Sequence, residues 1–211
     1  MFFPDTHTHF RTANPYSILN SFSSINIPHS RGIHPWQIDE NYKLNLHELE
    51  SDLQHPSCLA LGEIGLDKVC TTDFNLQRKL LIKQIELSEK HNLPVIIHCV
   101  KASNELFQLK REINPTQPWI WHGFNKANLL TQTLENSIIP SFGFSLFTNS
   151  KLLEEFSKLR ENQYLIETDN STFSIETMYH LIAMIRKIPT DELKKEQMAN
   201  FTSIFTKWHI G

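Results

Sequence analysis

The chain has 211 residues and a formal net charge of −3, from 20 lysine and arginine residues against 23 aspartate and glutamate residues. This length suits one domain with a large core, and we expect residues 1–211 to form a single domain. The charge excludes a protein that coats nucleic acid through a basic face alone. It does not exclude an enzyme that holds one or two phosphates through metal ions.

No apolar run of the sequence approaches the length that spans a bilayer, and the first residues lack the pattern of a signal peptide. We therefore expect a cytoplasmic protein with no membrane partner and no obligate protein partner. The three cysteines, Cys58, Cys70 and Cys99, are odd in number and have no metal-type spacing. They are expected to be reduced thiols.

Short apolar runs alternate with amphipathic segments along the whole chain. We predict strands at residues 1–4, 28–34, 58–62, 93–97, 118–121, 138–143 and 163–166, with a weaker candidate at 17–22. Helices are predicted at residues 41–54, 72–91, 102–112, 126–135, 152–159, 175–186 and 191–205. This alternation is typical of a parallel α/β fold.

Seven or eight strands that alternate with helices favour a TIM-like (β/α) barrel. An open, doubly wound sheet is the alternative, but the sequence has no glycine-rich phosphate fingerprint to support it. The segment between His9 and Gly32 lacks the pattern of a full strand and helix unit, so we expect the first βα unit to be shortened. In a barrel, reactive side chains gather at the carboxyl ends of the strands.

The first motif that carries chemistry is Asp5-Thr6-His7-Thr8-His9. In an extended segment successive side chains alternate between faces, so His7 and His9 point the same way and can converge on one ion. Residues of the same kind recur at later predicted strand ends. The full set of metal-capable side chains at the expected barrel mouth is His7, His9, Glu63, His98, His122 and Asp169. The remaining histidines apart from His34, at positions 29, 47, 55, 91, 180 and 209, are expected to have surface or core roles.

The motifs occur together in an order that resembles the TatD-type metal-dependent hydrolases, relatives of the amidohydrolases. They are Asp5-Thr-His-Thr-His9, Gly32-Ile-His-Pro35, Gly62-Glu-Ile-Gly-Leu-Asp67, Ile97-His98-Cys99, His122-Gly-Phe124 and Glu167-Thr-Asp169. The resemblance implies a TIM-like barrel with a two-metal site and the activity of a metal-dependent deoxyribonuclease.

The resemblance also implies a role for each site residue. His7, His9 and Asp169 would hold one divalent ion, His98 and His122 the other, and Glu63 would bridge the two. His34 would contact substrate phosphate or support the site from behind the ligands. Asp67 and Asp5 are interpreted as partners that orient a ligand histidine.

The chemistry of such a site follows from its ligands. Two divalent ions about 4 Å apart activate a water and stabilise the charge that develops on the scissile phosphate. Asp169 is in a position to accept the proton of that water, and with Glu63 it forms the predicted catalytic pair. Imidazole mixed with carboxylate favours zinc, manganese or cobalt over a site of oxygen ligands alone, but magnesium stays open.

The substrate is the least determined part of the prediction. DNA or a smaller phosphoester is favoured, and the same activated water also attacks amides and lactones in related barrels. The carboxylated lysine of amidohydrolases has no counterpart here, since Lys101 follows His98 in a loop. A non-catalytic binding protein is a third alternative, which the complete set of candidate ligands disfavours.

Four aromatic residues lie near the motifs. Trp36 and Phe124 are candidates to line the mouth, whereas Trp119 and Trp121 are expected to pack in the core.

Overall fold

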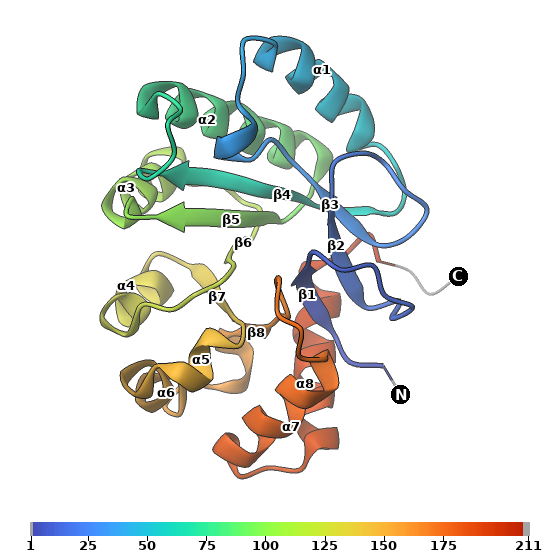
Figure 1. Cartoon of the computed structure of the whole chain (residues 1–211), viewed down its shortest axis with the longest axis vertical. Coiled ribbons are helices and arrows are strands. Elements are labelled where there is room, and N and C mark those ends of the chain that lie inside the picture. Colours follow the sequence, from blue (N-terminus) through green and yellow to red (C-terminus); the bar gives the residue numbers. More distant parts are fainter. Residues whose placement is uncertain (1, 209–211) are drawn as a thin grey trace.

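The computed structural model describes residues 2–208 and contains eight parallel strands in sequential order around a barrel (Figure 1). The strands are β1 (Asp5–Thr8), β2 (Ser17–Ser21), β3 (His29–Arg31), β4 (Cys58–Asp67), β5 (Val95–Val100), β6 (Trp119–Trp121), β7 (Ile138–Phe142) and β8 (Leu165–Ile166). An isolated parallel bridge between Thr8 and Asp169 joins the last strand to the first. The predicted barrel with eight strands is confirmed.

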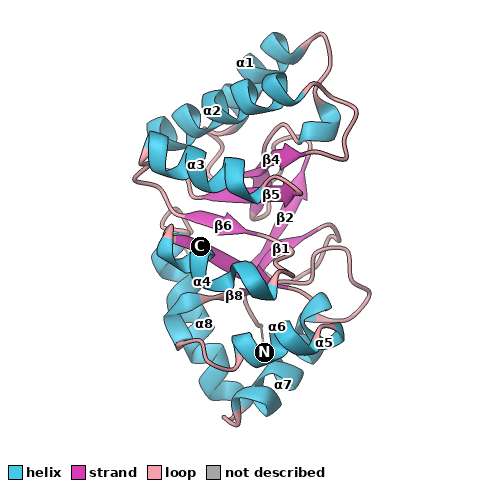
Figure 2. Cartoon of the chain, turned by 90° about the vertical axis from the view of Figure 1, so that its left-hand side faces the viewer, coloured by secondary structure: helices cyan, strands magenta, loops and turns pink. Residues whose placement is uncertain are grey.

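Helices lie outside the strands, with α1 to α3 over one end of the molecule and α5 to α8 over the other in both views (Figures 1 and 2). They are α1 (Tyr42–Asp52), α2 (Phe74–His91), α3 (Ser103–Ile113), α4 (Leu130–Glu135), α5 (Ser145–Thr148), α6 (Ser150–Phe156), α7 (Ile175–Arg186) and α8 (Thr190–Ile204). Short 3-10 helices occur at η1 (Pro35–Gln37), η2 (Ala127–Leu129) and η3 (Glu161–Gln163). Residues 9–16 and 22–28 contain no helix, so the shortened first unit is also confirmed.

Most strand boundaries differ from those predicted; β5, for example, runs from Val95 to Val100 and contains His98, and three other differences affect segments near the site. The first strand begins at Asp5 rather than at residue 1, because Asp5 N donates to the Tyr16 carbonyl and starts the pairing with β2. The third strand ends at Arg31, and His34 caps η1 instead of ending a strand. The fourth strand continues through Glu63 to Asp67, since the whole segment is buried between β3 and β5.

The barrel has an apolar end and a polar end. Ile18, Leu59, Ile96 and other residues near the amino ends of their strands pack in one cluster with the aromatic residues at the end of α8. That cluster includes Phe201 and Phe205, both fully buried. With the amino end filled by hydrocarbon, the polar side chains gather at the carboxyl end of the strands.

Close pairing of β4 with β5 depends on a glycine. A Cβ atom on Gly65 would lie 1.8 Å from the backbone oxygen of His98, so no larger residue fits there without moving a strand. Gly65 pairs with His98 in the parallel register of the two strands. This close approach brings the side chains of Glu63 and Asp67 to the imidazole of His98.

Candidate metal centre

The carboxylate of Glu63 lies at the centre of the polar end of the barrel, with imidazole rings on both sides of it. Its Oε2 atom is 3.7 Å from His7 Nε2 and 3.8 Å from His9 Nε2. Its side chain is almost completely buried, and Asn20 Nδ2 donates a hydrogen bond to Oε2 at 3.4 Å. Residues from β1, β2 and β4 therefore converge on one oxygen of this carboxylate.

The other oxygen of Glu63 faces three further histidines. Its Oε1 atom lies 2.7 Å from His122 Nε2 and 2.8 Å from His98 Nδ1. His34 Nε2 lies 3.4 Å from the same atom. The two oxygens of one carboxylate thus point to two separate groups of imidazoles, which is the arrangement expected of a carboxylate that bridges two ions.

Asp169 completes the group on the Oε2 side. Its Oδ1 atom lies 3.3 Å from His9 Nε2 and 3.7 Å from His7 Nε2. The backbone fixes this approach, because Asp169 N donates to the His7 carbonyl and His9 N donates to the Asp169 carbonyl. The bridge that closes the barrel is therefore also the contact that brings these three side chains together.

The buried nitrogens of this cluster fit a metal ion. Both ring nitrogens of His7 are buried and have no hydrogen-bond partner in the described part of the chain. Buried polar atoms are seldom left unpaired in native proteins, and Nε2 of His7, which faces the carboxylates of Glu63 and Asp169, is placed to bind an ion. The donor atoms of His7, His9 and Glu63, of His7, His122 and Asp169, and of His34, Glu63 and His98 each lie within 4.8 Å of one another.

These three groups of donor atoms differ in detail from the division of ligands between two ions that the family resemblance implied. His34, expected beside the site, lies within the same group as Glu63 and His98. His122 lies close to His7 and Asp169 as well as to Glu63, with 4.4 Å between the ring centroids of His7 and His122. His122 therefore contacts both groups of side chains.

The electrostatics of the cluster favour cations. Burial raises the pKa of Glu63, but His122, His34 and His98 outweigh it and hold the pKa well below its usual range. Burial lowers the pKa of His7 to about 3, which keeps its ring neutral with lone pairs available for an ion. Burial also lowers the pKa of His122, yet Glu63 and other carboxylates outweigh it and bring the pKa to about 9. Negative charge is thus concentrated where bound cations would sit.

Asp67 orients His98, in the manner expected from the sequence. The Oδ2 atom of Asp67 lies 3.0 Å from His98 Nε2, and the indole Nε1 of Trp36 donates to the same oxygen at 2.7 Å. His98 thereby has a carboxylate at each ring nitrogen, Glu63 at one and Asp67 at the other. Trp36 fixes the Asp67 carboxylate, a role that the sequence did not predict.

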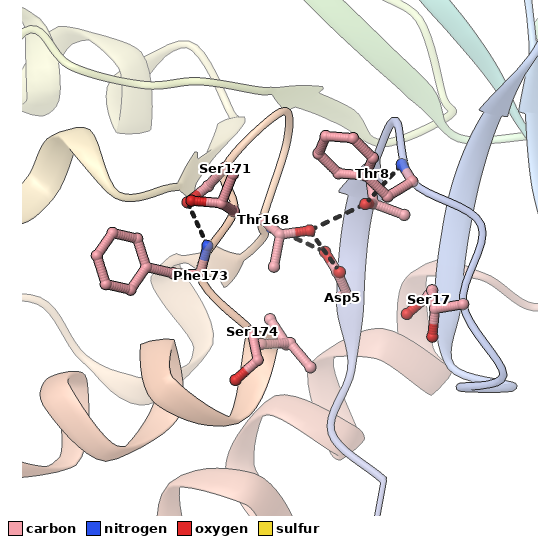
Figure 3. Close-up of a pocket in the computed structure, with 11 residues that line it drawn as sticks. Asp5, Thr8, Ser17, Thr168, Ser171, Phe173 and Ser174 are labelled. Atoms are coloured by element: carbon pink, nitrogen blue, oxygen red, sulfur yellow. Dashed lines mark hydrogen bonds between the residues drawn. The ribbon is translucent and has the colours of Figure 1, made fainter.

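Asp5 has a different partner from the one expected. Its carboxylate accepts hydrogen bonds from Thr168 N at 2.9 Å and Thr168 Oγ1 at 2.7 Å, rather than from an imidazole (Figure 3). The prediction that Asp5 orients a ligand histidine is therefore corrected. Asp5 instead anchors the residue that precedes Asp169. Burial raises the pKa of Asp5 to about 7.

A pocket of about 450 Å³ lies beside this anchor, between the loop after β1 and the loop after β8 (Figure 3). Its lining includes Thr8, Phe10, Thr168 and Phe173. The Phe173 ring stacks on Phe144 with 4.3 Å between centroids. The pocket therefore adjoins the strands that carry His7 and Asp169.

Two buried glutamines of α2 hold the segments that carry His34 and Asp67. Gln84 accepts from Ile33 N at 2.7 Å and donates to the Ile33 carbonyl at 3.1 Å. Gln77 accepts from Asp67 N at 2.8 Å and donates to the Asp67 carbonyl at 3.0 Å. Gln77 and Gln84 are seven residues apart and so lie on the same face of the helix. This spacing, together with the apolar residues around it, was the signal in the sequence that both glutamines are buried.

Other residues at the site were missed or misplaced. The buried carboxylate of Glu167 accepts a hydrogen bond from Gly123 N at 2.6 Å, and burial raises its pKa to about 8. Gly123 has a φ of 59°, a conformation that favours glycine.

Phe124, expected to line the mouth, is fully buried against Trp121 and Phe142, so that prediction is wrong. Trp119 and Trp121 are buried as expected.

A family model described as TatD-related DNase matches residues 6–206. The chain belongs to this family. An uncharacterized metal-dependent hydrolase of Mycoplasma genitalium is 29% identical over 205 residues, which cover 84% of this chain and 77% of that protein. The chain is therefore a member of a family of metal-dependent hydrolases.

Two further TatD-related proteins extend the comparison. The crystal structure of the Escherichia coli homologue YjjV has a TM-score of 0.81 and 21% identity, and the match covers 97% of this chain and 98% of that one. A human protein named as a 3′-5′ RNA nuclease is 31% identical over 129 residues, 57% of this chain and 17% of that protein. The YjjV structure shows the shared fold.

Within residues 2–208, no helix has the length and apolar character needed to cross a membrane.

Proposed function

We propose that this TatD-related chain is a two-metal phosphodiesterase that hydrolyses nucleic acid, with residues 1–211 acting as one hydrolase domain. The observation that carries the proposal is the carboxylate of Glu63, whose two oxygens face two different groups of imidazoles. His7, His9 and Asp169 would hold one ion, and His98 with His122 the other. The structure adds His34 as a candidate ligand on the second side, because it lies 3.4 Å from Glu63 Oε1.

Two divalent ions bound there would activate a water and neutralise charge on the phosphate oxygens. Within the chain, Asp169 is the proposed proton acceptor, because its carboxylate is partly exposed while that of Glu63 is buried. Burial raises the pKa of Asp169, but hydrogen bonding from His9 and the charges of nearby histidines lower it below its usual value. Its ionised form is therefore favoured. Asp67 holds the ring of His98, and Thr168 with Asp5 fixes the backbone beside Asp169.

Exposed aromatic side chains favour nucleic acid over a small ester. Phe10, Phe22, Trp36 and Phe173 follow β1, β2, β3 and β8, and their exposed fractions are 52, 67, 67 and 44%. Loops after parallel strands meet at the same end of a barrel, so these rings lie around the candidate metal centre. Aromatic rings at such positions are platforms on which unpaired bases stack. A relative named as an RNA nuclease supports the same class of substrate.

The test is release of nucleotides from labelled single-stranded DNA and RNA, with magnesium or manganese supplied, by the wild type and by Asp169→Asn. We expect release by the wild type that disappears in the variant while the fold, followed by circular dichroism, is unchanged. Asp191→Asn on α8 is a matched control that should keep full activity. Wild-type protein that binds metal but releases no nucleotide would refute the nuclease assignment and turn the search to small phosphoesters, amides and lactones.

A further inference from the structure

A pocket of about 540 Å³ beside the candidate metal centre is lined by three lysines, and we call it the lysine pocket. The lysines come from three different segments: Lys101 follows β5, Lys126 follows β6, and Lys151 lies on α6 after β7. Asn125, Asn128, Asn149 and Ser103 supply further polar groups. No aspartate or glutamate lines the pocket.

The charge of these lysines is not neutralised by carboxylates. Several other lysines, such as Lys68, Lys90 and Lys158, form ion pairs with glutamates. In the ion pairs found among residues 2–208, none involves Lys101, Lys126 or Lys151. Three ammonium groups around one cavity repel one another, and an anion that enters the cavity relieves that repulsion. A chain with a net charge of −3 thus has, within the part that the structure describes, three lysines without an ion-pair partner around one pocket.

The lysine pocket lies within reach of the candidate metal ligands. Lys101 is three residues after His98, and Lys126 is four residues after His122, so their Cα atoms lie within about 10 and 14 Å of those ligands even in a fully extended chain. Asn149 Nδ2 donates to the Asn125 carbonyl at 3.2 Å and ties the loop after β6 to the start of α6. This hydrogen bond holds the segments of Lys126 and Lys151 together, and all three lysines line the same pocket.

We propose that the lysine pocket is a subsite for a backbone phosphate of a single-stranded nucleic acid, next to the phosphate that is cleaved at the metal centre. A backbone phosphate fits the donors, because it is a monoanion with two non-bridging oxygens and the pocket offers ammonium, amide and hydroxyl groups. A strand crossing the mouth places its cleaved phosphate over Glu63, a neighbouring phosphate in the lysine pocket, and bases against the exposed aromatic rings. This inference rests on the proposed function and specifies how that substrate is held.

The test compares the double variant Lys126→Glu/Lys151→Glu with the control Lys43→Glu/Lys195→Glu. The control makes the same change in net charge on the exposed surfaces of α1 and α8. Each protein is assayed with a single-stranded oligonucleotide and with bis(4-nitrophenyl) phosphate, a diester that has no neighbouring phosphate. We expect the pocket variant to raise KM for the oligonucleotide at least tenfold and to leave hydrolysis of the small diester within twofold of the wild type. The control should match the wild type on both substrates.

Binding is measured independently of catalysis, by fluorescence anisotropy of the oligonucleotide in a chelator that prevents cleavage. The slope of log Kobs against log salt should decrease in magnitude by about 0.7 in the pocket variant, because that is the contribution of one phosphate contact to a single strand. Inorganic phosphate should compete weakly with the oligonucleotide for the wild type, and an equal effect of phosphate on the pocket variant would count against the subsite.

The outcomes separate this inference from the proposed function. If the wild type cleaves neither diester, the proposed function fails, and the anisotropy measurement still decides whether the lysine pocket binds phosphate. If the wild type cleaves both substrates and the pocket variant behaves like the control in every assay, the proposed phosphate subsite is refuted and the proposed nuclease function is supported. Equal loss on both substrates would also overturn the subsite, because it would show that the lysines act through the metal centre.

Discussion

The Nε2 atom of His122 lies 2.7 Å from Oε1 of Glu63. This contact joins β6 to β4 across the mouth of the barrel, with β5 and its His98 between them. A buried carboxylate with several imidazoles in contact needs positive charge beside it, since burying unpaired charge is costly. Glu63 raises the pKa of His122 to about 9 and so favours a proton on that ring, and divalent ions would provide the positive charge in the proposed enzyme.

Asp67→Asn tests how the ring of His98 is held. The amide keeps the shape of the side chain but removes the negative charge that faces His98 Nε2. We expect affinity for manganese or zinc to fall about 10- to 100-fold, the usual effect of losing a partner that orients a ligand. Competition with a chromophoric chelator measures it, with Asp39→Asn on the exposed loop before α1 as the control. Equal affinity in the wild type and in Asp67→Asn would show that His98 needs no such partner.

Gln77→Met tests the support that α2 gives to Asp67. The methionine fills a similar volume but leaves the N–H and carbonyl of Asp67 without their side-chain partner. We expect the free energy of unfolding to fall by about 2 kcal/mol, because buried polar groups that lose a partner cost about 1–3 kcal/mol each. Urea denaturation in a chelator measures the change. Gln108→Met, on the exposed face of α3, should change it by less than about 0.5 kcal/mol.

The sequence indicated which side chains gather at the polar end of the barrel, because each of those residues follows or lies within a buried strand. His7 and Asp169 meet where the barrel closes, and Glu63 reaches both across the mouth from β4, because the carboxyl ends of parallel strands gather at one end of a barrel. The fold was predictable for the same reason.

Other features depend on contacts that local patterns do not encode. Thr168 binds Asp5 across 163 positions of sequence, and nothing near Asp5 indicates that partner. Phe124 was expected at the mouth because it follows His122. Gly123, which lies between them, has a positive φ, and the Phe124 ring packs against Phe142 in the core. The helix α5 spans only four residues and was not predicted, since so short a segment has no helical periodicity.

Gly65→Ala tests the close approach of β4 and β5. The added methyl group would meet the backbone of His98, which cannot move without separating the strands. We expect a loss of about 3 kcal/mol or more in unfolding free energy, at the upper end of overpacking effects. Gly143→Ala is the matched control, because a Cβ atom there meets Glu167 only at an ordinary 3.8 Å. Similar stability of the two variants, measured by denaturation in a chelator, would contradict the account of strand pairing.

Trp36 tests whether the aromatic rim binds bases. Trp36→Phe keeps an aromatic ring and loses the hydrogen bond to Asp67, whereas Trp36→Ala loses both. We expect the alanine variant to bind a single-stranded oligonucleotide about tenfold more weakly, since stacking contributes about 1–3 kcal/mol per base. The phenylalanine variant should retain most of the affinity. Met184→Ala, an exposed residue of α7, is the control. An equal loss in both Trp36 variants would assign the effect to Asp67 instead of to stacking.

The central claim is that Glu63 bridges two divalent ions. The most direct measurement is the metal content per chain of the wild type and of Glu63→Gln, by elemental analysis after loading with manganese or zinc and dialysis. Glutamine keeps the size of the side chain but cannot provide two anionic oxygens. The account predicts two ions per wild-type chain and at most one in the variant, with the fold unchanged by circular dichroism. Two ions retained in Glu63→Gln, or a single ion in both proteins, would contradict it.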